Sequence, residues 1–449
     1  MAHERLKVVI IGAGFGGLYA AQTLERQADI DVLLIDKNNY HTFTPLLYQV
    51  ATCGLDADAI AYPIRGIFRR QSNVDFLLGS VTAIDTTAQR VTVQASGEER
   101  IESYDRLIIA AGSVTNYFGN SAIGKFAFEL KSLEDALRLR SHILSIFERA
   151  AWSADDAARY AYTTIVVVGG GPTGLETAGA MQELYSFVLK KEYTGLTPRV
   201  ILVEAVDRLL VAYPERLQAA AKRQLESLGV EVILGDAVEK AFDDHIILKS
   251  GRVIPTHTLV WSAGVQAAPA AELIATEVGK AGRLMVEPTM AVKNVENVYA
   301  VGDIVYLLND KGVPYAAQIP VAKQQGELAA RNLLRKRMMQ AELPFVYRDR
   351  GIMATIGRSR AVAWLYYRIQ LTGFAAWLAW LALHLVSLLG MRNRLNVLLN
   401  WVWNYFTFDR SARIILPLKQ KSTPSLPENN VESSALPPSG VERDLAGVR

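Results

Sequence analysis

Two glycine-rich turns carry the clearest chemical signal in this 449-residue sequence. The first turn follows an aliphatic run at residues 8–11 and precedes a helical pattern, so its bare backbone and the N–H groups of the helix start can face a pyrophosphate. A second aliphatic run ends in Asp36, whose carboxylate can accept hydrogen bonds from the hydroxyls of an adenosine ribose. We predict that this dinucleotide contacts Gly12, Gly14, Phe15, Gly16 and Gly17.

The second turn repeats the pattern after the aliphatic run 165–168. Its candidate ligand residues are Gly169, Gly171, Pro172, Thr173 and Gly174. The next aliphatic run ends in Glu204, which lies farther from its glycines than the usual ~20 residues, so its assignment to a ribose depends on its place at a strand end. An acid at this place would repel a 2′-phosphate, which favours NADH over NADPH. Two copies of one nucleotide-binding unit are more specific than either copy alone.

Small residues end two further aliphatic runs, and such residues let backbone come near a ligand. They are Ala110, Ala111 and Gly112 in the first run and Ala263 and Gly264 in the second. Asp303 ends a third run and is either a turn residue or a cofactor contact. Residues 37–51, which include Lys37 and Pro45, are too rich in turn formers and aromatic residues to predict a regular element. They form either a surface loop or a further part of the first nucleotide site.

Length and composition limit the class of protein. A chain of 449 residues, half of them hydrophobic, predicts two or three domains. The net charge of +3 gives no reason to expect a nucleic-acid partner. Cys53 is the single cysteine, which excludes an internal disulfide, and the six histidines are scattered, so we predict no metal and no iron–sulfur centre. We expect no secretory signal, because glycines interrupt the first apolar run.

The C-terminal part of the sequence indicates contact with a membrane. Residues 371–389 contain no charged side chain, and tryptophans and arginines near them suit a bilayer interface. Small residues on one side of this segment are expected to pack on protein, with the bulky side in lipid. In the next segment asparagines recur every four residues opposite leucines, which predicts an amphipathic helix. We therefore expect a monotopic protein at the cytoplasmic face of the cell membrane, with a single span over 371–389 as the alternative.

The paired turns, the Ala-Gly strand ends and the run 298–303 resemble the flavoprotein oxidoreductases with two dinucleotide-binding domains, in which the first copy binds FAD and the second NAD(P)H. Within this group, residues 41–51, 170–176, 322–326 and 353–358 are similar to type II NADH dehydrogenase, the single-subunit NADH:quinone oxidoreductase. The resemblance implies an α/β fold of two Rossmann-like domains, the second inserted into the first. The predicted parts are an FAD-binding domain at 1–125 and 290–340, an NADH-binding domain at 160–289, a membrane-anchoring region at 341–417 and a disordered tail at 418–449.

The resemblance also implies roles for single residues. It places Asp303 and Gln318 at the FAD and matches Glu176 and Gln324 to residues near the quinone. Without the resemblance, Glu176 reads equally well as an acid favoured by the helix dipole, and both glutamines as residues of a helix surface. The family's quinone signature is Ala-Gln-x-Ala-x-Gln. Aligned on Gln324, it has Ile319 and Pro320 at the positions of the first Ala and Gln, and Gln318 lies two positions early.

The expected function is therefore hydride transfer from NADH to FAD, followed by transfer of two electrons to a membrane quinone without proton pumping. The expected partners are NADH, the quinone and a lipid surface, and a homodimer is left open. Two alternatives remain. One is a reductase of the same fold for another acceptor, such as ferredoxin or a biosynthetic naphthoquinone. The other is a redox-sensing protein that binds FAD and NADH. Disulfide reductases and sulfide:quinone reductases are excluded, because Cys53 has no second cysteine to pair with.

Overall fold

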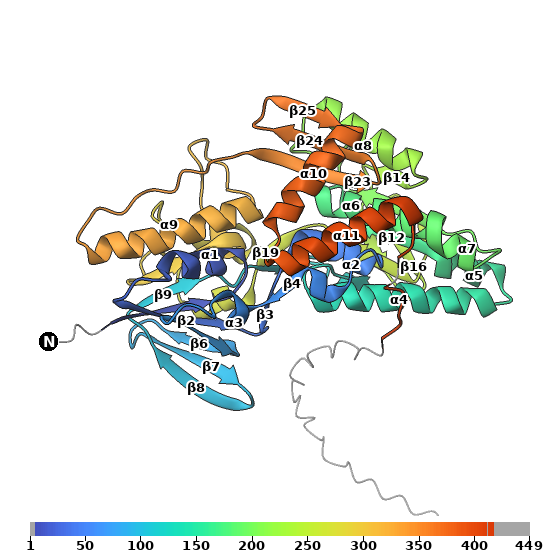
Figure 1. The fold of residues 1–449 in the computed structure, drawn as a ribbon. Coiled ribbons are helices and arrows are strands. Elements are labelled where there is room, and N and C mark those ends of the chain that lie inside the picture. The colour runs from blue at the N-terminus through green and yellow to red at the C-terminus, as the bar shows by residue number, and fades with distance from the viewer. Residues whose placement is uncertain (1–4, 411, 417–449) are drawn as a thin grey trace, which may run out of the picture. The chain divides into compact units, whose positions relative to one another are not determined.

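The computed structural model of the chain describes residues 5–410 and 412–416. Two parallel sheets of aliphatic strands organise these residues (Figure 1). The strands of the first sheet come from the two ends of the sequence that flank the second sheet. In spatial order they are β21 (Val298–Ala300), β9 (Arg106–Ile109), β1 (Leu6–Ile11), β2 (Ile30–Asp36) and β5 (Val74–Leu78).

The second sheet is built entirely from residues that lie between β9 and β21 in the sequence. Its strands, in spatial order, are β11 (Ala127–Phe128), β18 (Thr258–Trp261), β12 (Thr164–Val168), β13 (Arg199–Glu204) and β14 (Glu231–Leu234). All neighbours within both sheets pair in parallel. The predicted α/β fold, with one Rossmann-like unit inserted into another, is confirmed.

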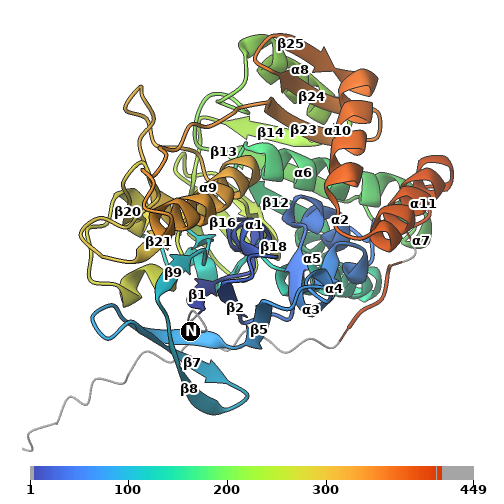
Figure 2. The ribbon, with the colours of Figure 1, turned by 60° about the vertical axis from the view of Figure 1, so that its left-hand side comes forward.

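Helices cover both sheets, because each sheet and each helix has an apolar face that must be buried. α1 (Phe15–Leu24) and α9 (Ile319–Arg337) lie side by side on the first sheet (Figures 1 and 2). A Cβ added to Gly326 of α9 would lie 2.1 Å from the Gly16 carbonyl oxygen of α1, so the two backbones touch. The other helices of the sheet units are α2 (Leu47–Ala51), α3 (Ile64–Ile67), α4 (Leu133–Trp152), α5 (Asp156–Thr163), α6 (Pro172–Leu184), α7 (Lys190–Glu192) and α8 (Glu215–Ser227).

Short antiparallel elements complete the two units. One three-stranded sheet joins β6 (Ser80–Asp85), β7 (Arg90–Ala95) and β8 (Glu98–Ser103), and another joins β15 (Val238–Ala241), β16 (His245–Leu248) and β17 (Val253–Pro255). The two-stranded pairs are β3 (Tyr40–Thr42) with β4 (Ala61–Pro63), β10 (Ser113–Thr115) with β19 (Val265–Ala267), and β20 (Leu284–Met285) with β22 (Val305–Tyr306).

The expectation that residues 37–51 hold no regular element is wrong. The segment contains β3, a 3₁₀ turn at Thr44–Leu46 and α2. Its leucines and Val50 are buried in the core that α4 and α6 share, so tertiary packing stabilises a helix that Pro45 and the aromatic residues conceal in the sequence.

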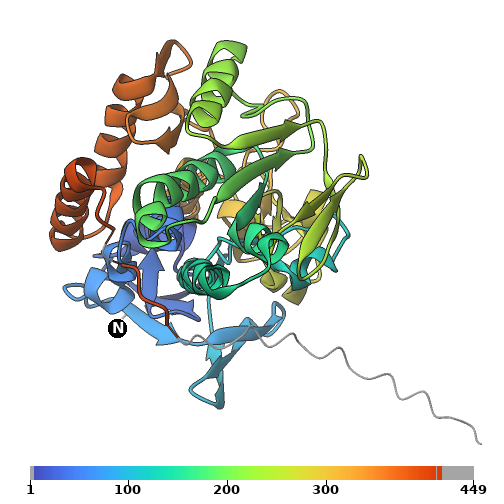
Figure 3. The same ribbon diagram turned by 90° about the vertical axis from the view of Figure 1, so that its right-hand side faces the viewer.

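The C-terminal residues form a small sheet and two helices. The sheet joins β23 (Gly351–Gly357), β24 (Arg360–Leu365) and β25 (Ile369–Thr372), and α10 (Gly373–Ser387) and α11 (Met391–Thr407) follow. Figure 3 shows both helices along one edge of the sheet units, with α11 (red) beside the N-terminal segments drawn in blue. The predicted amphipathic helix is confirmed. The predicted tail at 418–449 lies outside the described residues.

The alternative of a membrane span over 371–389 is wrong. β25 takes the first residues of the segment, and α10 has 15 residues, which reach about 22 Å where a bilayer core needs about 30 Å. Across the residues that the structure describes, no helix is both long and apolar enough to cross a membrane. The expected small-residue side of α10 is also wrong, because its buried residues are Ala376 and Trp380 while Ala375 and Ala382 are exposed.

Candidate active site

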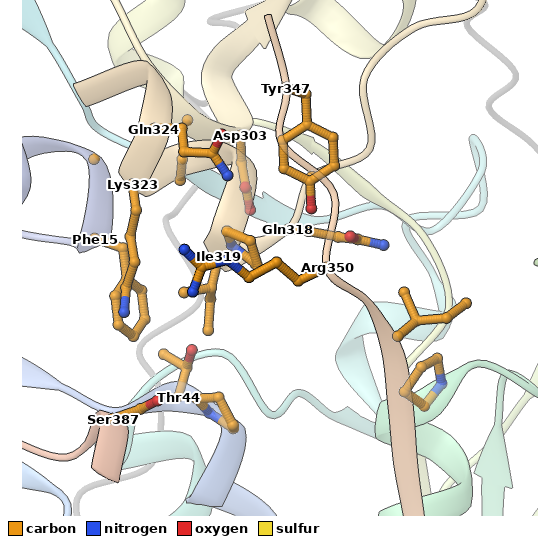
Figure 4. Close-up of a pocket in the computed structure, with 18 of the residues that line it drawn as sticks. Phe15, Thr44, Asp303, Gln318, Ile319, Lys323, Gln324, Tyr347, Arg350 and Ser387 are labelled. Atoms are coloured by element: carbon orange, nitrogen blue, oxygen red, sulfur yellow. The ribbon is translucent and has the colours of Figure 1, made fainter. Parts of the chain in front are cut away.

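A cavity of about 1830 Å³ lies where the two sheet units meet the C-terminal helices. Its wall includes Gly14 of the first glycine turn, Gly171 of the second and His384 of α10. Figure 4 shows side chains from α1, α9, α10 and the segment before β23 converging on it. The repeat found in the sequence therefore produces one shared site.

The first turn has the geometry of a phosphate cradle. Gly12 has a φ of +100°, and a Cβ on Gly17 would lie 1.9 Å from the Gly12 carbonyl oxygen, so the helix can start this close to the strand only without side chains. A Cβ on Gly14 would meet nothing within 4 Å, which leaves space for a ligand against the backbone. Phe15 and Gly16 line the cavity beside it.

Asp36 sits at the end of β2, as predicted, and is held by the turn. Its carboxylate accepts hydrogen bonds from the backbone N–H groups of Ala13 and Asn38, both at 2.7 Å. Burial nevertheless raises the pKa of Asp36 above its ordinary value. Lys37, by contrast, is exposed and is not part of the cavity wall.

The far end of the first unit brings several predicted residues together. Asp303, Gln318 and Pro45 line the cavity, as do Ala110, Ala111 and Gly112. Asp303 Oδ2 accepts a 2.8 Å hydrogen bond from the Ser113 hydroxyl, to which Lys131 Nζ donates at 3.0 Å. Sequence reasoning missed Ser113 and Lys131, although Ser113 directly follows the predicted strand end.

The second turn copies the first. A Cβ on Gly174 would lie 1.8 Å from the Gly169 carbonyl oxygen, whereas Gly171 opens into free space. Glu204 accepts hydrogen bonds from the N–H groups of Gly170 and Val206, as Asp36 does in the first unit. Pro172 and Thr173 line the cavity, but Ala263 and Gly264 do not, and Gly264 packs against Phe118.

Glu176 lies one turn into α6 and is buried in the cavity wall. Its Oε1 accepts two long hydrogen bonds, 3.3 Å from Thr355 N–H and 3.2 Å from Trp380 Nε1–H. These two bonds stabilise the carboxylate less than burial destabilises it, and the pKa of Glu176 rises to about 8. The side chain is therefore a neutral acid at pH 7.

Gln324 is not free at the cavity wall. Its amide donates to the Arg348 carbonyl oxygen at 3.2 Å and accepts from Arg348 N–H at 2.9 Å, which ties α9 to the segment before β23. The next residue, Gln325, is buried and accepts a 2.8 Å hydrogen bond from Gly302 N–H, beside Asp303. The sequence pattern missed Gln325.

Further cavity residues were not predicted from the sequence. Lys323 Nζ lies over the rings of Phe15 and Tyr19, 5.3 Å and 4.8 Å from their centroids. Arg350 extends into the cavity in Figure 4. His384 stacks on Trp380 with a centroid separation of 3.8 Å. Of the residues described here, none form a cluster with the side chains needed to hold a metal ion.

Comparison with known proteins agrees with this geometry. Residues 6–326 match the pyridine nucleotide-disulphide oxidoreductase family, and residues 350–410 match the NDH2 C-terminal domain. The chain is 44% identical over 415 residues to the type II NADH:quinone oxidoreductase NdhA of Mycobacterium tuberculosis, covering 88% of this chain and 86% of that protein. It is 41% identical over 425 residues to Ndh of the same organism, covering 92% and 90% of the two chains.

A solved structure shares the fold at much lower identity. The structure of NDH2 from Plasmodium falciparum in complex with NADH superposes with a TM-score of 0.83 and 19% identity, covering 92% of this chain and 100% of that one. The match in fold extends over both nucleotide units and the C-terminal region. Together with the identities to the mycobacterial enzymes, it shows that the chain belongs to the family of type II NADH:quinone oxidoreductases.

Proposed function

We propose that the shared cavity is the complete electron-transfer site of this enzyme. As a member of its family, the protein is an FAD-dependent oxidoreductase that carries electrons from NADH to a quinone. The observation that carries the proposal is the joining of three features in one cavity: two nucleotide turns, a neutral buried acid and the wall of α10.

The first unit fits FAD. The open space at Gly14 and the carboxylate of Asp36 suit a pyrophosphate and a ribose, and Asp303 lies across the cavity for the ribitol chain. FAD bound by these residues would supply a hydride acceptor for NADH and a two-electron donor for the quinone. The residues proposed to hold it are Gly12, Gly14, Phe15, Gly16, Gly17, Asp36, Pro45, Ala110, Ala111, Gly112, Asp303 and Gln318. A contact between Lys37 and FAD stays a prediction, because Lys37 does not line the cavity.

The second unit fits NADH. Its phosphates would meet the N-terminus of α6, and Glu204 would face the ribose and repel a 2′-phosphate. The residues proposed to bind NADH are Gly169, Gly171, Pro172, Thr173, Gly174 and Glu204. Ala263 and Gly264 remain predictions, because they lie outside the wall of the cavity.

Glu176 is proposed as the proton donor to the quinone. Quinone reduction needs protons at the quinone oxygens, and a neutral carboxyl at pH 7 can supply one of them and regain it from solvent. Gln324 is proposed to act by holding the segment before β23 against α9, since its amide is already engaged there.

A monotopic position on the membrane is proposed from α11. Two of its asparagines face the protein, where Asn404 donates to the Gly54 carbonyl oxygen and Asn393 to that of Ala61. Val397 and Trp401 pack against the core, while most of the other apolar residues of α11 point outward. With the exposed part of α10 they make a surface that we call the apolar foot. Its residues are Phe374, Leu378, Leu383, Val386, Met391, Leu395, Leu398, Leu399, Val402, Trp403 and Phe406. We propose that the foot enters the cytoplasmic leaflet and that the quinone reaches the cavity along α10.

We also propose the domain bounds given by the sequence. The strands of the first sheet fall within 1–125 and 290–340, and those of the second, except β11, within 160–289. The region 341–417 then begins after α9 and carries β23 to β25 and the foot. A homodimer stays a prediction.

The first test is a visible spectrum of the purified protein without oxygen. We expect flavin bands that bleach on addition of NADH and return on addition of a short-chain quinone. Bleaching without return would leave both nucleotide sites in place but would refute the quinone site. A folded protein that binds no flavin would refute the whole proposal.

A further inference from the structure

His384 is a polar residue in the cavity wall to which the proposed function gives no role. It lies on α10, between Leu383 and Val386 of the apolar foot and the buried Trp380. Leu383, His384 and Ser387 all line the cavity. A quinone that moves from lipid along α10 into the cavity must therefore pass this ring.

The hydrogen bond of His384 fixes its tautomer. Nδ1 lies 2.7 Å from the Trp380 carbonyl oxygen, one turn earlier on α10. A carbonyl oxygen can only accept, so Nδ1 carries the proton and donates it. Nε2 of the neutral ring is then a bare acceptor. In the part of the chain that the structure describes, no group hydrogen-bonds to Nε2.

The surroundings keep the ring neutral. It stacks on Trp380 and meets the edge of Phe43 at a centroid separation of 6.0 Å. This burial lowers the pKa of His384 to about 4, so Nε2 stays unprotonated at physiological pH. Glu176, which accepts a hydrogen bond from Trp380 Nε1–H, is protonated at the same pH. One wall of the cavity thus presents a hydrogen-bond donor, Glu176, and an acceptor, His384, that both contact the same indole.

The two redox forms of a quinone need different partners. Quinone carbonyl oxygens only accept hydrogen bonds, whereas the hydroxyl groups of the quinol can donate. The reaction consumes NADH, one proton and the quinone, and it yields NAD⁺ and the quinol. Glu176 suits the quinone, and Nε2 of His384 suits only the quinol. Resting on the quinone site proposed above, we propose that His384 binds the reduced product by accepting a hydrogen bond from one quinol hydroxyl.

The experiment is an equilibrium titration that does not depend on turnover. Decylubiquinone and its quinol are titrated separately into flavin-loaded protein without NADH or oxygen, and Kd is measured by calorimetry. In His384→Phe, which keeps an aromatic ring against Trp380, we expect the Kd for the quinol to rise about three- to tenfold, the loss expected for one neutral hydrogen bond. The Kd for the quinone should change less than about twofold, since no bond to it is removed.

Two further variants make the test specific. His384→Gln keeps an acceptor oxygen and should recover much of the affinity for the quinol. Ser387→Ala is the matched control, because its hydroxyl already donates to the Leu383 carbonyl oxygen. Equal weakening of quinone and quinol binding in His384→Phe, or no weakening at all, would overturn the inference. Wild-type protein whose flavin is reduced by NADH but not reoxidised by quinone would instead refute the proposed function, and the inference with it.

Discussion

Buried carboxyl groups in this protein differ in how many short hydrogen bonds they accept. Asp36 accepts two backbone bonds at 2.7 Å, while Glu176 accepts only bonds of 3.2 and 3.3 Å, both at the same oxygen. Backbone N–H groups stabilise the charged form, so they partly offset the desolvation that acts on both residues, although burial still raises the pKa of Asp36. Asp36 is thus built to remain a fixed acceptor, whereas Glu176 is built to hold a proton.

The pKa of Glu176 predicts how quinone reduction depends on pH. Because this pKa is raised to about 8, the carboxyl holds its proton below pH 8 and loses it as the pH rises through that value. The kcat with quinone should therefore be level up to about pH 7 and fall above pH 8. In Glu176→Gln we expect kcat to drop about 100-fold at pH 7, the lower end for general acid catalysis, and the fall near pH 8 to vanish.

A control separates this role from a structural one. Anaerobic bleaching of the flavin by NADH is measured in the same variant by stopped flow, and it should change far less than kcat. A Glu176→Gln enzyme that keeps the wild-type break near pH 8 would show that another group sets the profile.

For single residues, the sequence predicted which residue types form the site better than it predicted their hydrogen-bond partners. Asp36 and Glu204 were predicted because a strand end places them, and the glycines because the turn requires them. The state of Glu176 depends on Thr355 and Trp380, which are 179 and 204 residues away in the sequence. Local spacing carries no information on such contacts.

The two glycine turns act as separate elements and can be tested as a reciprocal pair. A side chain at Gly17 or Gly174 would lie within 2 Å of the Gly12 or Gly169 carbonyl oxygen, so alanine must push the helix start away from its strand. Gly17→Ala should purify without flavin absorbance. Gly174→Ala should keep its flavin but bleach only at much higher NADH concentrations. Each variant is the control for the other, and loss of flavin from both would contradict separate sites.

The end of α11 is held by one arginine. The Arg358 guanidinium donates to the carbonyl oxygens of Asn404 and Tyr405 in the last turn of α11, where the Asn404 oxygen also accepts from Phe408 N–H. Its central carbon lies 3.4 Å from the ring centroid of Phe408. Its own N–H donates to Glu183, which also pairs with Arg410. These contacts join the apolar foot to α6.

Removing this arginine should loosen α11. In Arg358→Ala we expect a loss of about 1.5–3 kcal/mol for each charged hydrogen bond, felt locally as faster hydrogen exchange over residues 400–407. Arg358→Lys should be intermediate, since an ammonium cannot form the planar pair of bonds. Arg360→Ala is the matched control, because among the described residues its guanidinium makes one hydrogen bond, to the Arg358 carbonyl oxygen, which is long at 3.4 Å. Unchanged hydrogen exchange over α11 in Arg358→Ala would refute the role of Arg358 in holding the end of this helix.

At the level of elements, the sequence predicted what periodicity could reveal. The apolar spacing of residues 134–151 predicts a helix, and α4 covers these residues from a capping box between Ser132 and Asp135. The amphipathic pattern predicted for α11 was also correct, but a helical wheel cannot show which side of the helix meets the protein. The residues 37–51 and α10 were misjudged because their structure depends on buried contacts with α6 and with β24.

For the whole chain, the repeat of strand, turn, helix and acid predicted two nucleotide-binding units, and the order of strands confirms that one is inserted into the other. The sequence could not predict that both turns would open into one cavity with α10. That arrangement depends on packing between residues more than 150 positions apart, such as Trp380 and Glu176. The proposed path from lipid to cofactor is therefore a property of the tertiary structure.

The apolar foot makes a prediction about the protein as a whole. Phe406 is 77% exposed and Leu399 66% exposed on the outer side of α11. Burial of one such side chain in lipid is worth about 1.5–3 kcal/mol, and every 1.4 kcal/mol is about tenfold in affinity. Phe406→Asp should therefore lower binding to anionic lipid vesicles at least about tenfold in a flotation assay, while NADH oxidation with a soluble quinone persists.

The matched control is Trp152→Asp at the end of α4. Trp152 is 88% exposed, so it offers the same kind of apolar surface at a site outside the foot. A general loss of surface hydrophobicity would weaken vesicle binding equally in both variants. Binding that falls only in Phe406→Asp would place the foot in the bilayer. That position would also explain why α10 lines the cavity. A quinone dissolved in lipid would then reach Leu383 and His384 without first entering water.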